Sequence, residues 1–288
     1  MNIAFLGLGI MGSRMAANLL KNKVDLTVFN RSEAPRKELE AKGAKVAGSF
    51  TSAVKGADIV FTMLSTPKVV EEIMFGEKGC LASMKKEALW VDFSTVDPAF
   101  SKQSEQEAAK RNVRFADTPV AGTKKPAEEG SLVFFVGADK RNFKEIEILL
   151  PFMGSKIIHV GETGKGTSLK MLVNAMLAES MLIFSETLLL GEKMGFSKDF
   201  LLDTLPNLPV IAPFTKAKAE LIRNNNFDVQ FPLEWMEKDL RLVLKTASKN
   251  NHEMPITGLT KELFGQANAS GLGRNDFSAI YKFLNEKK

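Results

Sequence analysis

A glycine-rich turn near the start of the chain restricts the fold more than any other feature. Residues 2–6 form an apolar run that leads directly into Gly7, Gly9 and Gly12, and a helical pattern over residues 13–22 follows. Glycines in this Gly-x-Gly-x-x-Gly spacing permit a tight turn, close approach of the backbone to a pyrophosphate, and close packing of helix on strand. The pyrophosphate would bind at the positive N-terminal end of that helix. The turn therefore predicts a dinucleotide-binding unit whose cofactor contacts come from Gly7, Leu8, Gly9, Ile10, Met11 and Gly12.

The end of the next expected strand, residues 25–29, indicates which dinucleotide binds. An NAD-binding unit usually carries an acidic residue about 20 residues beyond the glycines, where it holds the ribose 2′-hydroxyl. In this chain the strand is followed by Asn30, Arg31 and Ser32. A guanidinium and a hydroxyl suit a 2′-phosphate, so we predict NADPH rather than NADH. The acidic Glu33 argues against this choice, and an arginine that is merely solvated in a loop is the alternative.

Strand-like runs alternate with helical segments over the first half of the chain. Strands are expected over residues 58–64, 89–93, 113–116, 132–137 and 156–160, and helices over 32–42, 67–75 and 99–112. Such alternation predicts a mostly parallel, doubly wound sheet. After Gly161 only helical patterns remain, over residues 167–194, 197–204, 214–224, 233–250, 256–269 and 276–285. We therefore expect a Rossmann-type domain over residues 1–162 and an all-helical domain over 163–288, joined through a long central helix.

Small polar residues follow several of the expected strands. Ligands of doubly wound sheets bind beyond the carboxyl ends of the strands. We therefore expect the cofactor to be bordered by Met63, Leu64, Ser65 and Thr95. The hydroxyls of these two loops, Ser65-Thr66 and Ser94-Thr95, can also cap the helices that follow, and both roles are compatible.

The central helix, residues 164–195, is apolar on almost every face and is predicted to be buried on most sides. Lys170 and Asn174 are four residues apart and therefore share one face. A buried lysine is costly unless an anionic group meets it, although a lysine in the first turn can also reach solvent. The surplus of apolar residues indicates burial against a second subunit, a dimer or tetramer, with cover by the chain's own helices as the alternative.

Composition restricts the class of protein. The net charge is +5, but the basic residues are scattered and the lysine pairs are isolated, which argues against nucleic-acid binding. Cys80 is the single cysteine, so an intrachain disulfide is excluded, which suits the reducing cytoplasm. No signal peptide is expected from the N-terminal sequence. Asn174, Glu179 and Glu186 interrupt the central helix, so we do not expect it to span a membrane.

No His/Cys/Asp cluster has the spacing of metal ligands, so we expect no metal. His159 and His252 are the only histidines and adjoin no motif, so both are expected to be structural or solvated. The segment 117–130 is rich in turns, and its amides around Gly122 with the hydroxyl of Thr123 can cup a carboxylate.

Several long motifs span nearly the whole chain, in the order FLGLGIMGSRMAANLLK, VDFSTVDP, DTPVAGTKKPAEEG, VGETGKGTSLKMLVN, EKDLRLVLKTA and GLGRNDFSA. Together they resemble the β-hydroxyacid dehydrogenases, which include 3-hydroxyisobutyrate and tartronate semialdehyde reductases. The KKPAEEG variant resembles the glyoxylate and succinic semialdehyde reductase branch of that family.

The resemblance implies roles for individual residues. Lys170 would be the catalytic lysine, and Asn174 would help to position the substrate. The substrate carboxylate would bind at Ala121, Gly122 and Thr123, and Thr95 would approach both substrate and nicotinamide. Phe231, Lys238 and Asp239 would close the site from the helical domain, with Lys238 also contacting the cofactor. The family usually has Ser-Gly-Gly or Ser-Gly-Ser where this chain has Ala121, so carboxylate binding would weaken or shift to Thr123.

The chemistry of the residues agrees with this implication. Reduction of an aldehyde by hydride transfer leaves an alkoxide that needs a proton and a positive charge. With no metal or well-placed histidine expected, a lysine is the remaining acid, and Lys170 follows a glycine turn that would let a substrate approach. The hypothesis is an NADPH-dependent reductase of small aldehyde acids such as glyoxylate or succinic semialdehyde. The alternatives are a 3-hydroxyisobutyrate-type dehydrogenase, an imine reductase, which the presence of Lys170 disfavours, and a non-catalytic NADPH-binding interaction protein.

Overall fold

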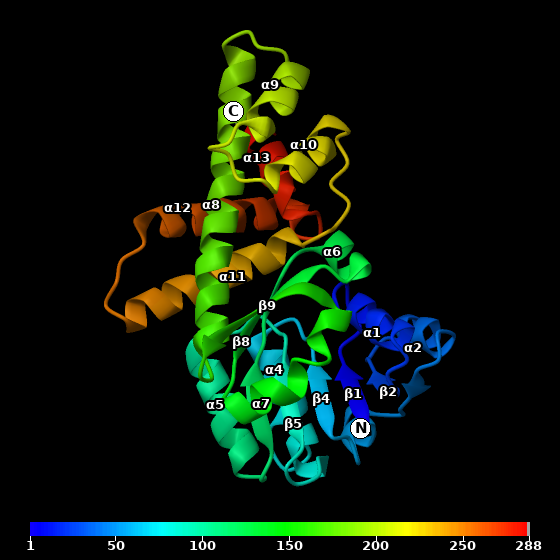
Figure 1. The fold of residues 1–288 in the computed structure, drawn as a ribbon. Coiled ribbons are helices and arrows are strands. Elements are labelled where there is room, and N and C mark those ends of the chain that lie inside the picture. Colours follow the sequence, from blue (N-terminus) through cyan, green and yellow to red (C-terminus); the bar gives the residue numbers. More distant parts are fainter. Residues whose placement is uncertain (287–288) are drawn as a thin grey trace. The chain divides into compact units, whose positions relative to one another are not determined.

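The computed structural model describes residues 1–286, and Figure 1 shows their helices and strands. Lys287 and Lys288, the last of the isolated lysine pairs, lie outside the described residues. The chain forms two compact units, Met1–Lys170 and Met171–Lys288. The boundary between the units lies inside a long helix, whereas the boundary expected from the sequence lies just before that helix.

The first unit is built on one sheet in which six neighbouring strands are parallel. The strands are β1 (Ile3–Leu6), β2 (Leu26–Phe29), β3 (Lys45–Val46), β4 (Ile59–Thr62), β5 (Leu89–Asp92), β6 (Arg114–Asp117), β7 (Val120–Ala121), β8 (Leu132–Gly137) and β9 (Gly154–Gly161). Their order is β3-β2-β1-β4-β5-β6-β8-β7, with β9 paired to β8. β8 runs antiparallel to its neighbours β6 and β7, and β9 runs parallel to β8. The predicted mostly parallel, doubly wound sheet is confirmed.

Helices cover both faces of this sheet. They are α1 (Gly12–Lys21), α2 (Glu33–Glu40), α3 (Phe50–Val54), α4 (Pro67–Met74), α5 (Pro98–Ala109), α6 (Lys124–Glu129) and α7 (Lys140–Ile146). Along β1 the side chains alternate between two cores: Ile3 and Phe5 belong to one, Ala4 and Leu6 to the other. Because successive side chains of a strand point to opposite faces, the sheet is buried on both sides.

The helix caps agree only in part with those expected from the sequence. Thr66 caps α4, as expected, because its hydroxyl accepts a hydrogen bond from the Val69 amide. The expectation that Ser94 or Thr95 would cap α5 is wrong. Asp97 does so, immediately before Pro98, and accepts from the Phe100 amide at 3.2 Å. A carboxylate next to the first helical residue is a good cap, which leaves the two hydroxyls for other contacts.

The second unit is helical, as predicted. It contains most of α8 (Lys165–Lys193), followed by α9 (Lys198–Thr204), α10 (Thr215–Arg223), α11 (Leu233–Lys249), α12 (Pro255–Ala267) and α13 (Ile280–Glu286). Its core is apolar and includes Met181, Phe184, Leu240 and Phe264. The sequence periodicity therefore located each helix to within a few residues.

The exposure of α8 differs from the expectation along one stripe. A stripe along it, here called the α8 stripe, is exposed by 58 to 70% and consists of Leu172, Met176, Ile183, Leu190 and, one residue beyond the end of α8, Met194. Most other side chains of α8 are buried or partly buried, so the prediction that the helix is buried on most sides holds except along this stripe. By length and composition α8 could also cross a membrane, but that is weak evidence, because core helices of soluble proteins meet the same criterion.

Candidate active site

The expected cofactor residues of the first unit lie just beyond the carboxyl ends of four parallel strands. Strands β2, β1, β4 and β5 are parallel neighbours in register, so their carboxyl ends lie at one edge of the sheet. The residues that follow these ends are Gly7 to Gly12, Asn30 to Ser32, Met63 to Ser65, and Thr95. The structure therefore brings all of these candidates to the edge where doubly wound sheets bind ligands.

Each of the three positions in the turn has a different structural reason to be glycine. Gly7 has φ +93°, and a Cβ there would lie 2.3 Å from the Met63 carbonyl oxygen. At Gly12 a Cβ would lie 2.0 Å from the Gly7 carbonyl oxygen. Around Gly9, by contrast, nothing lies within 4 Å of the Cβ position. Gly7 and Gly12 are therefore required by packing, whereas Gly9 leaves open space beside the backbone at the start of α1, which fits a pyrophosphate.

Asn30, which directly follows β2, is hydrogen-bonded to the glycine turn. Its Oδ1 accepts a hydrogen bond from the Leu8 amide at 3.0 Å. Arg31 and Ser32 beside it are exposed. The acidic Glu33 pairs with Lys37 on α2 at 2.9 Å, so a cation already partners its carboxylate. Because its charge is already partnered, Glu33 argues less strongly against the binding of a 2′-phosphate beside Arg31.

A buried network around Asp92 ties the ends of β4 and β5 together. Thr62 Oγ1 and the Ser94 amide donate to Asp92 Oδ1 at 2.7 and 3.0 Å. Ser94 Oγ accepts from the Leu64 amide at 2.9 Å, and Trp90 Nε1 donates to Thr62 Oγ1 at 2.8 Å. The other carboxylate oxygen of Asp92 has no hydrogen-bond partner among the described residues. Asp92 was not among the residues predicted from the sequence, although an acid at the end of the apolar run LWVDF was a signal.

Burial raises the pKa of Asp92 to about 6, from an ordinary value of 3.8. The folded protein therefore takes up a proton there that the unfolded chain does not, and the cost of burying the charge is relieved as the pH falls through about 6. When the pH is lowered from about 7 to about 5, we expect the unfolding free energy of wild type to rise by about 1 kcal/mol relative to that of Asp92→Asn. Urea unfolding followed by tryptophan fluorescence measures this. A difference between the two proteins that does not vary with pH would contradict the prediction.

Asp117, at the end of β6, fixes the start of α8. Its Oδ1 accepts from the Gly164 amide at 2.6 Å, and its Oδ2 accepts from the Thr167 amide and hydroxyl at 2.6 and 2.8 Å. A carboxylate at a helix N-terminus also interacts favourably with the helix dipole. Lys170 follows within the next turn of α8 and is buried. Asp117 therefore determines where the helix that carries Lys170 begins.

Two glycines at the contact between β8 and the start of α8 are required by packing. A Cβ on Gly166 would lie 2.3 Å from the Phe135 carbonyl oxygen, and one on Gly137 would lie 2.3 Å from Asp117 Oδ1. These glycines allow close packing of the helix start against β8. The turn itself contains Gly161 and Gly164, where a Cβ would lie no closer than 3.4 Å to a neighbouring atom, so the approach of a substrate at this turn stays a prediction.

The expected carboxylate loop lies beyond the carboxyl end of β6. Ala121 ends β7, and Gly122 has φ +123°, where a Cβ would lie 2.7 Å from Leu132 Cδ2. Thr123 precedes α6 but its hydroxyl caps no amide of that helix. The loop is fixed indirectly, because α6 is bonded to α1 through Arg14 to Glu128 at 2.7 Å and through Asn18 to the Ala127 carbonyl at 2.8 Å.

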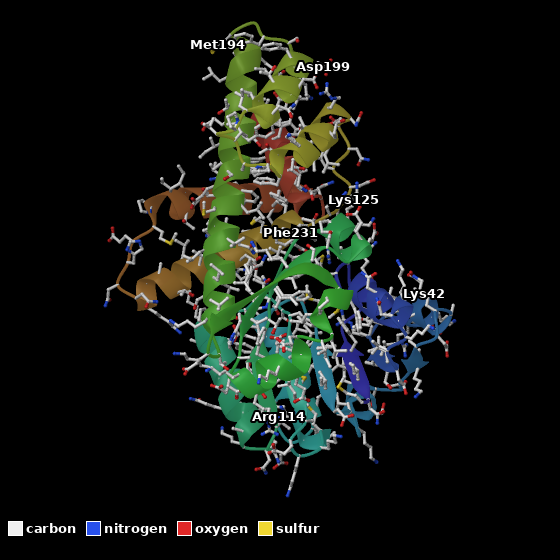
Figure 2. All side chains as sticks on the ribbon, viewed as in Figure 1. Lys42, Arg114, Lys125, Met194, Asp199 and Phe231 are labelled. Atoms are coloured by element: carbon white, nitrogen blue, oxygen red, sulfur yellow. The ribbon has the colours of Figure 1, made fainter. Side chains whose placement is uncertain are left out.

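In the second unit three of the expected residues form one buried cluster. Asn174 Nδ2 donates to Asp239 Oδ2 at 2.6 Å, and Lys238 Nζ lies 2.9 Å from Asp239 Oδ1. The Oδ1 of Asn174 is buried and has no hydrogen-bond partner among the described residues. Lys170 precedes Asn174 by one turn on the same helix. Phe231, labelled in Figure 2, lies two residues before α11 and is partly buried.

No group of three metal-ligating side chains occurs within residues 1–286. His159 is bonded through Nε2 to the Ala138 carbonyl at 2.8 Å and stacks on Phe143. Burial raises the pKa of the Cys80 thiol to about 12, as for a core residue.

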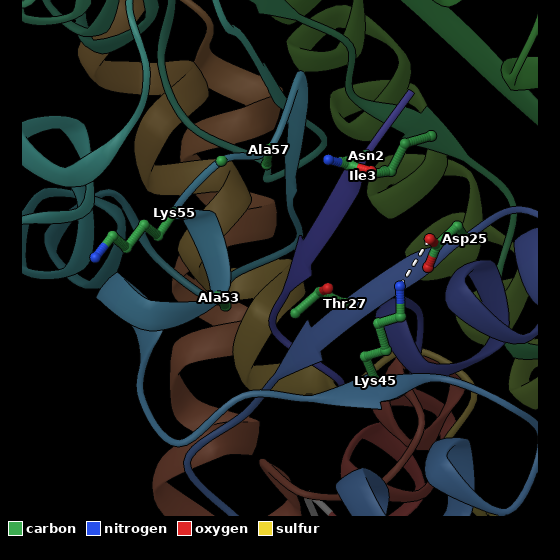
Figure 3. A pocket seen from close by; sticks show the side chains of 9 residues that line it. Asn2, Ile3, Asp25, Thr27, Lys45, Ala53, Lys55 and Ala57 are labelled. Atoms are coloured by element: carbon green, nitrogen blue, oxygen red, sulfur yellow. Dashed lines mark hydrogen bonds and ion pairs between the residues drawn. The ribbon is translucent and has the colours of Figure 1, made fainter.

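A cavity of about 180 Å³ lies at the opposite edge of the sheet. Figure 3 shows the side chains that line it. It is lined by residues at the amino ends of the strands, including Asn2, Asp25, Lys45 and Ala57, and Lys45 pairs with Asp25 at 2.7 Å. None of the candidate residues lines it. The cavity is therefore separate from the edge that fits the cofactor.

Comparisons with known proteins cover both units. Residues 2–161 match the family described as the NAD-binding domain of 6-phosphogluconate dehydrogenase. Residues 164–284 match the family described as the NAD-binding region of NADP-dependent 3-hydroxyisobutyrate dehydrogenase. These matches confirm the predicted nicotinamide dinucleotide cofactor.

Individual relatives match over nearly the whole chain. Glyoxylate/succinic semialdehyde reductase 1 from Arabidopsis thaliana is 36% identical over 97% of both chains. The 2-(hydroxymethyl)glutarate dehydrogenase of Eubacterium barkeri is 34% identical over 97% of this chain and 93% of its own. Among solved structures, 3-hydroxyisobutyrate dehydrogenase from Mycobacterium tuberculosis, solved with L-serine, has 29% identity, 98% coverage of both chains and a TM-score of 0.87.

Proposed function

We propose a reductive function from one premise: the chain belongs to the β-hydroxyacid dehydrogenase family. As a member, it is an NAD(P)-dependent hydroxyacid dehydrogenase. Within that class we propose an NADPH-dependent reductase that converts small aldehyde acids, such as glyoxylate and succinic semialdehyde, to the hydroxy acids. The similarity to glyoxylate/succinic semialdehyde reductase 1 supports this substrate class. The observation that carries the proposal is the buried Lys170 near the start of α8.

Lys170 has the chemistry of the acid that the reaction needs. Bound NADPH supplies the hydride. The carbonyl oxygen then gains negative charge, which a nearby ammonium stabilises and protonates. Lys170 is 7% exposed, and the contacts of Asp117 with Gly164 and Thr167 hold the first turn of its helix. In this proposal the Lys170 Nζ gives its proton to the substrate oxygen as the hydroxyl forms.

Asn174 has an unused acceptor one turn further along α8. Its amide nitrogen is held by Asp239, whose second oxygen pairs with Lys238. A buried amide oxygen without a partner costs free energy, and a donor from a ligand would remove that cost. We propose that Asn174 Oδ1 accepts a hydrogen bond from the hydroxyl of the hydroxy acid and so orients the reacting carbon.

The substrate carboxylate is proposed to bind at the loop that follows β7. The Gly122 amide and the Thr123 hydroxyl are the donors there, because Ala121 lacks the hydroxyl that the family serine has. Introducing that hydroxyl by Ala121→Ser would then lower KM for aldehyde acids. An unchanged KM would exclude Ala121 from the carboxylate site.

NADPH consumption with a panel of carbonyl compounds tests the proposed reaction. Turnover of glyoxylate and succinic semialdehyde supports it. Turnover of methylglyoxal alone would mean that the loss of the serine at Ala121 has changed the specificity. Oxidation of 3-hydroxyisobutyrate without reduction of either acid would favour the dehydrogenase alternative. Binding of NADPH without any turnover would favour a non-catalytic NADPH-binding protein.

Replacing Arg31 tests the preference for NADPH over NADH. Loss of a charge-assisted bond to the 2′-phosphate costs about 1.5–3 kcal/mol, so Arg31→Ala should lower kcat/KM for NADPH about 10–100-fold. The value for NADH should stay within about twofold, because NADH lacks that phosphate. The matched control is Arg141→Ala, an exposed arginine that pairs with Glu87. Equal losses with both cofactors would contradict the proposed role of Arg31.

We propose further that the enzyme is a homo-oligomer that covers the α8 stripe. Large exposed apolar patches on a soluble chain usually mark an interface. On α12 the exposed Ile256 and Leu259 extend this surface, because Thr257 between them donates to Glu179 of α8 at 2.5 Å. A second copy of the chain is the occupant that closed symmetry favours.

Ile183→Glu should reduce the mass in solution to that of one chain, because it places a charge in the middle of the α8 stripe. Ile183 is 59% exposed, so the substitution leaves the core intact. Light scattering coupled to gel filtration measures the mass. Ile148→Glu is the control, since Ile148 is 60% exposed in the first unit. A monomeric wild type would refute the proposal.

The cytoplasm is the proposed location, since the single Cys80 is a buried free thiol. Fractionation of cells followed by detection of the chain tests this. Recovery with a membrane or secreted fraction would overturn it.

A further inference from the structure

A second buried ion pair lies in the helical unit, outside the residues discussed so far. Lys218, from α10, contacts both carboxylate oxygens of Asp276 at 2.8 and 2.9 Å. The two side chains are 6% and 0% exposed. Removing two charges from water is expensive, and apolar residues of similar volume often stabilise a fold equally well. The pair is therefore weak evidence for a stabilising role, and its other contacts indicate what it does.

Asp276 also binds the main chain of the segment that leads into α11. Its Oδ2 accepts from the amides of Gln230 and Phe231 at 3.2 and 3.1 Å. Its Oδ1 accepts from the amide and hydroxyl of Ser278 at 3.1 and 2.7 Å. With the two bonds from Lys218, every lone pair of the carboxylate is engaged. One buried side chain thus connects α10, the segment before α11 and the turn before α13.

The main chain continues this connection on both sides of Asp276. The Phe277 amide donates to the Phe231 carbonyl at 2.9 Å, and the Leu233 amide donates to the Asn275 carbonyl at 2.9 Å. Pro232, at the N-cap of α11, provides no side-chain cap. The start of α11 is therefore fixed by the strand-like pairing with residues 275–277 rather than by a cap of its own.

The same group also fixes the Phe231 ring. That ring packs edge-on against Phe277 at 5.8 Å between centroids. The Lys218 ammonium lies over the Phe277 ring at 4.5 Å from its centroid. Lys218 and Asp276 thus determine both the backbone and the side-chain position of Phe231.

We infer that Asp276 is a positioning residue for the substrate, with Lys218 as its counter-ion. It holds the main chain at Gln230 and Phe231, just before α11. This inference rests on the proposed function, which assigns Phe231 to the substrate side of the reaction. It predicts that the Asp276 oxygen next to Phe231, rather than the charge of the pair, sets the affinity for the aldehyde acid.

Two uncharged versions of the Lys218–Asp276 pair distinguish a role in positioning Phe231 from a role in stabilising the fold. Lys218→Met with Asp276→Asn removes both charges but keeps an oxygen for the two amides. Lys218→Met with Asp276→Leu removes the oxygen as well. We expect KM for succinic semialdehyde to be about tenfold higher in the leucine version than in the asparagine version, as for the loss of one or two hydrogen bonds. KM for NADPH should differ by less than about twofold between the asparagine and leucine versions. Equal KM for the aldehyde acid in the two versions would overturn the inference.

If the leucine version does not fold, Asp276→Ser in the Lys218→Met background replaces it, because serine is too short to reach the amides. Hydrogen exchange gives a readout that does not depend on turnover. The Gln230 and Phe231 amides should exchange faster without the oxygen, whereas the Ala175 amide within α8 should not change. Unchanged exchange at Phe231 would refute the positioning role even in a protein that reduces no aldehyde acid. If exchange is faster in the version without the oxygen but wild type reduces no aldehyde acid, only the proposed function is refuted.

Discussion

Replacing Lys170 with alanine is expected to lower kcat for aldehyde acids about a thousandfold, within the range that general acid catalysis contributes. The expected loss is in kcat, because the proton and the positive charge act on the oxygen only as the alkoxide develops. Lys170 is buried, so a solvent-exposed lysine cannot take over its role. NADPH oxidation with succinic semialdehyde measures kcat and KM, and NADPH titration shows whether the cofactor site survives.

Lys165→Ala is the matched control for this variant. Lys165 begins the same helix but is exposed, so its loss should leave kcat within about twofold. Should Lys170→Ala retain the kcat of wild type while it binds NADPH normally, another group must supply the proton. Loss of NADPH binding in Lys170→Ala would instead mean that the residue supports the cofactor.

Gly9→Val is expected to weaken NADPH binding about a hundredfold or more while the protein stays folded, since a clash of this kind removes contacts worth about 3 kcal/mol. The space next to Gly9 is open, so a valine side chain meets no protein atom within 4 Å of the Cβ. It would, however, occupy the place where the backbone must approach the pyrophosphate. Calorimetric titration with NADPH measures the loss, and thermal melting without cofactor measures the fold.

Two other glycines provide the comparison. Gly12→Val should lower the melting temperature sharply, because its Cβ would lie 2.0 Å from the Gly7 carbonyl oxygen. Gly48→Val should change neither property, since Gly48 is exposed and its Cβ would also meet nothing within 4 Å. Normal NADPH affinity in Gly9→Val would show that the cofactor does not lie against this turn.

The local patterns of the chain were sufficient for the fold class. The spacing of Gly7, Gly9 and Gly12, the alternation of short apolar runs with helices, and the helical periodicity after Gly161 are all properties of neighbouring residues. β3 and β7 were not predicted, because strands of two residues carry no alternation to detect. The antiparallel direction of β8 also left no trace in its composition.

The sequence by itself determined the class of fold, the family and the set of residues at the strand ends, because these depend on short-range patterns and on long motifs. Only the tertiary structure decided what holds those residues in place. Asp117 meets Thr167 across 50 positions of the chain, and Asp276 meets Lys218 across 58. It also decided that one stripe of α8 stays exposed, against the expectation from its uniform apolar composition. Periodicity reports which side chains share a face, but the partner that a buried carboxylate meets depends on how distant segments pack.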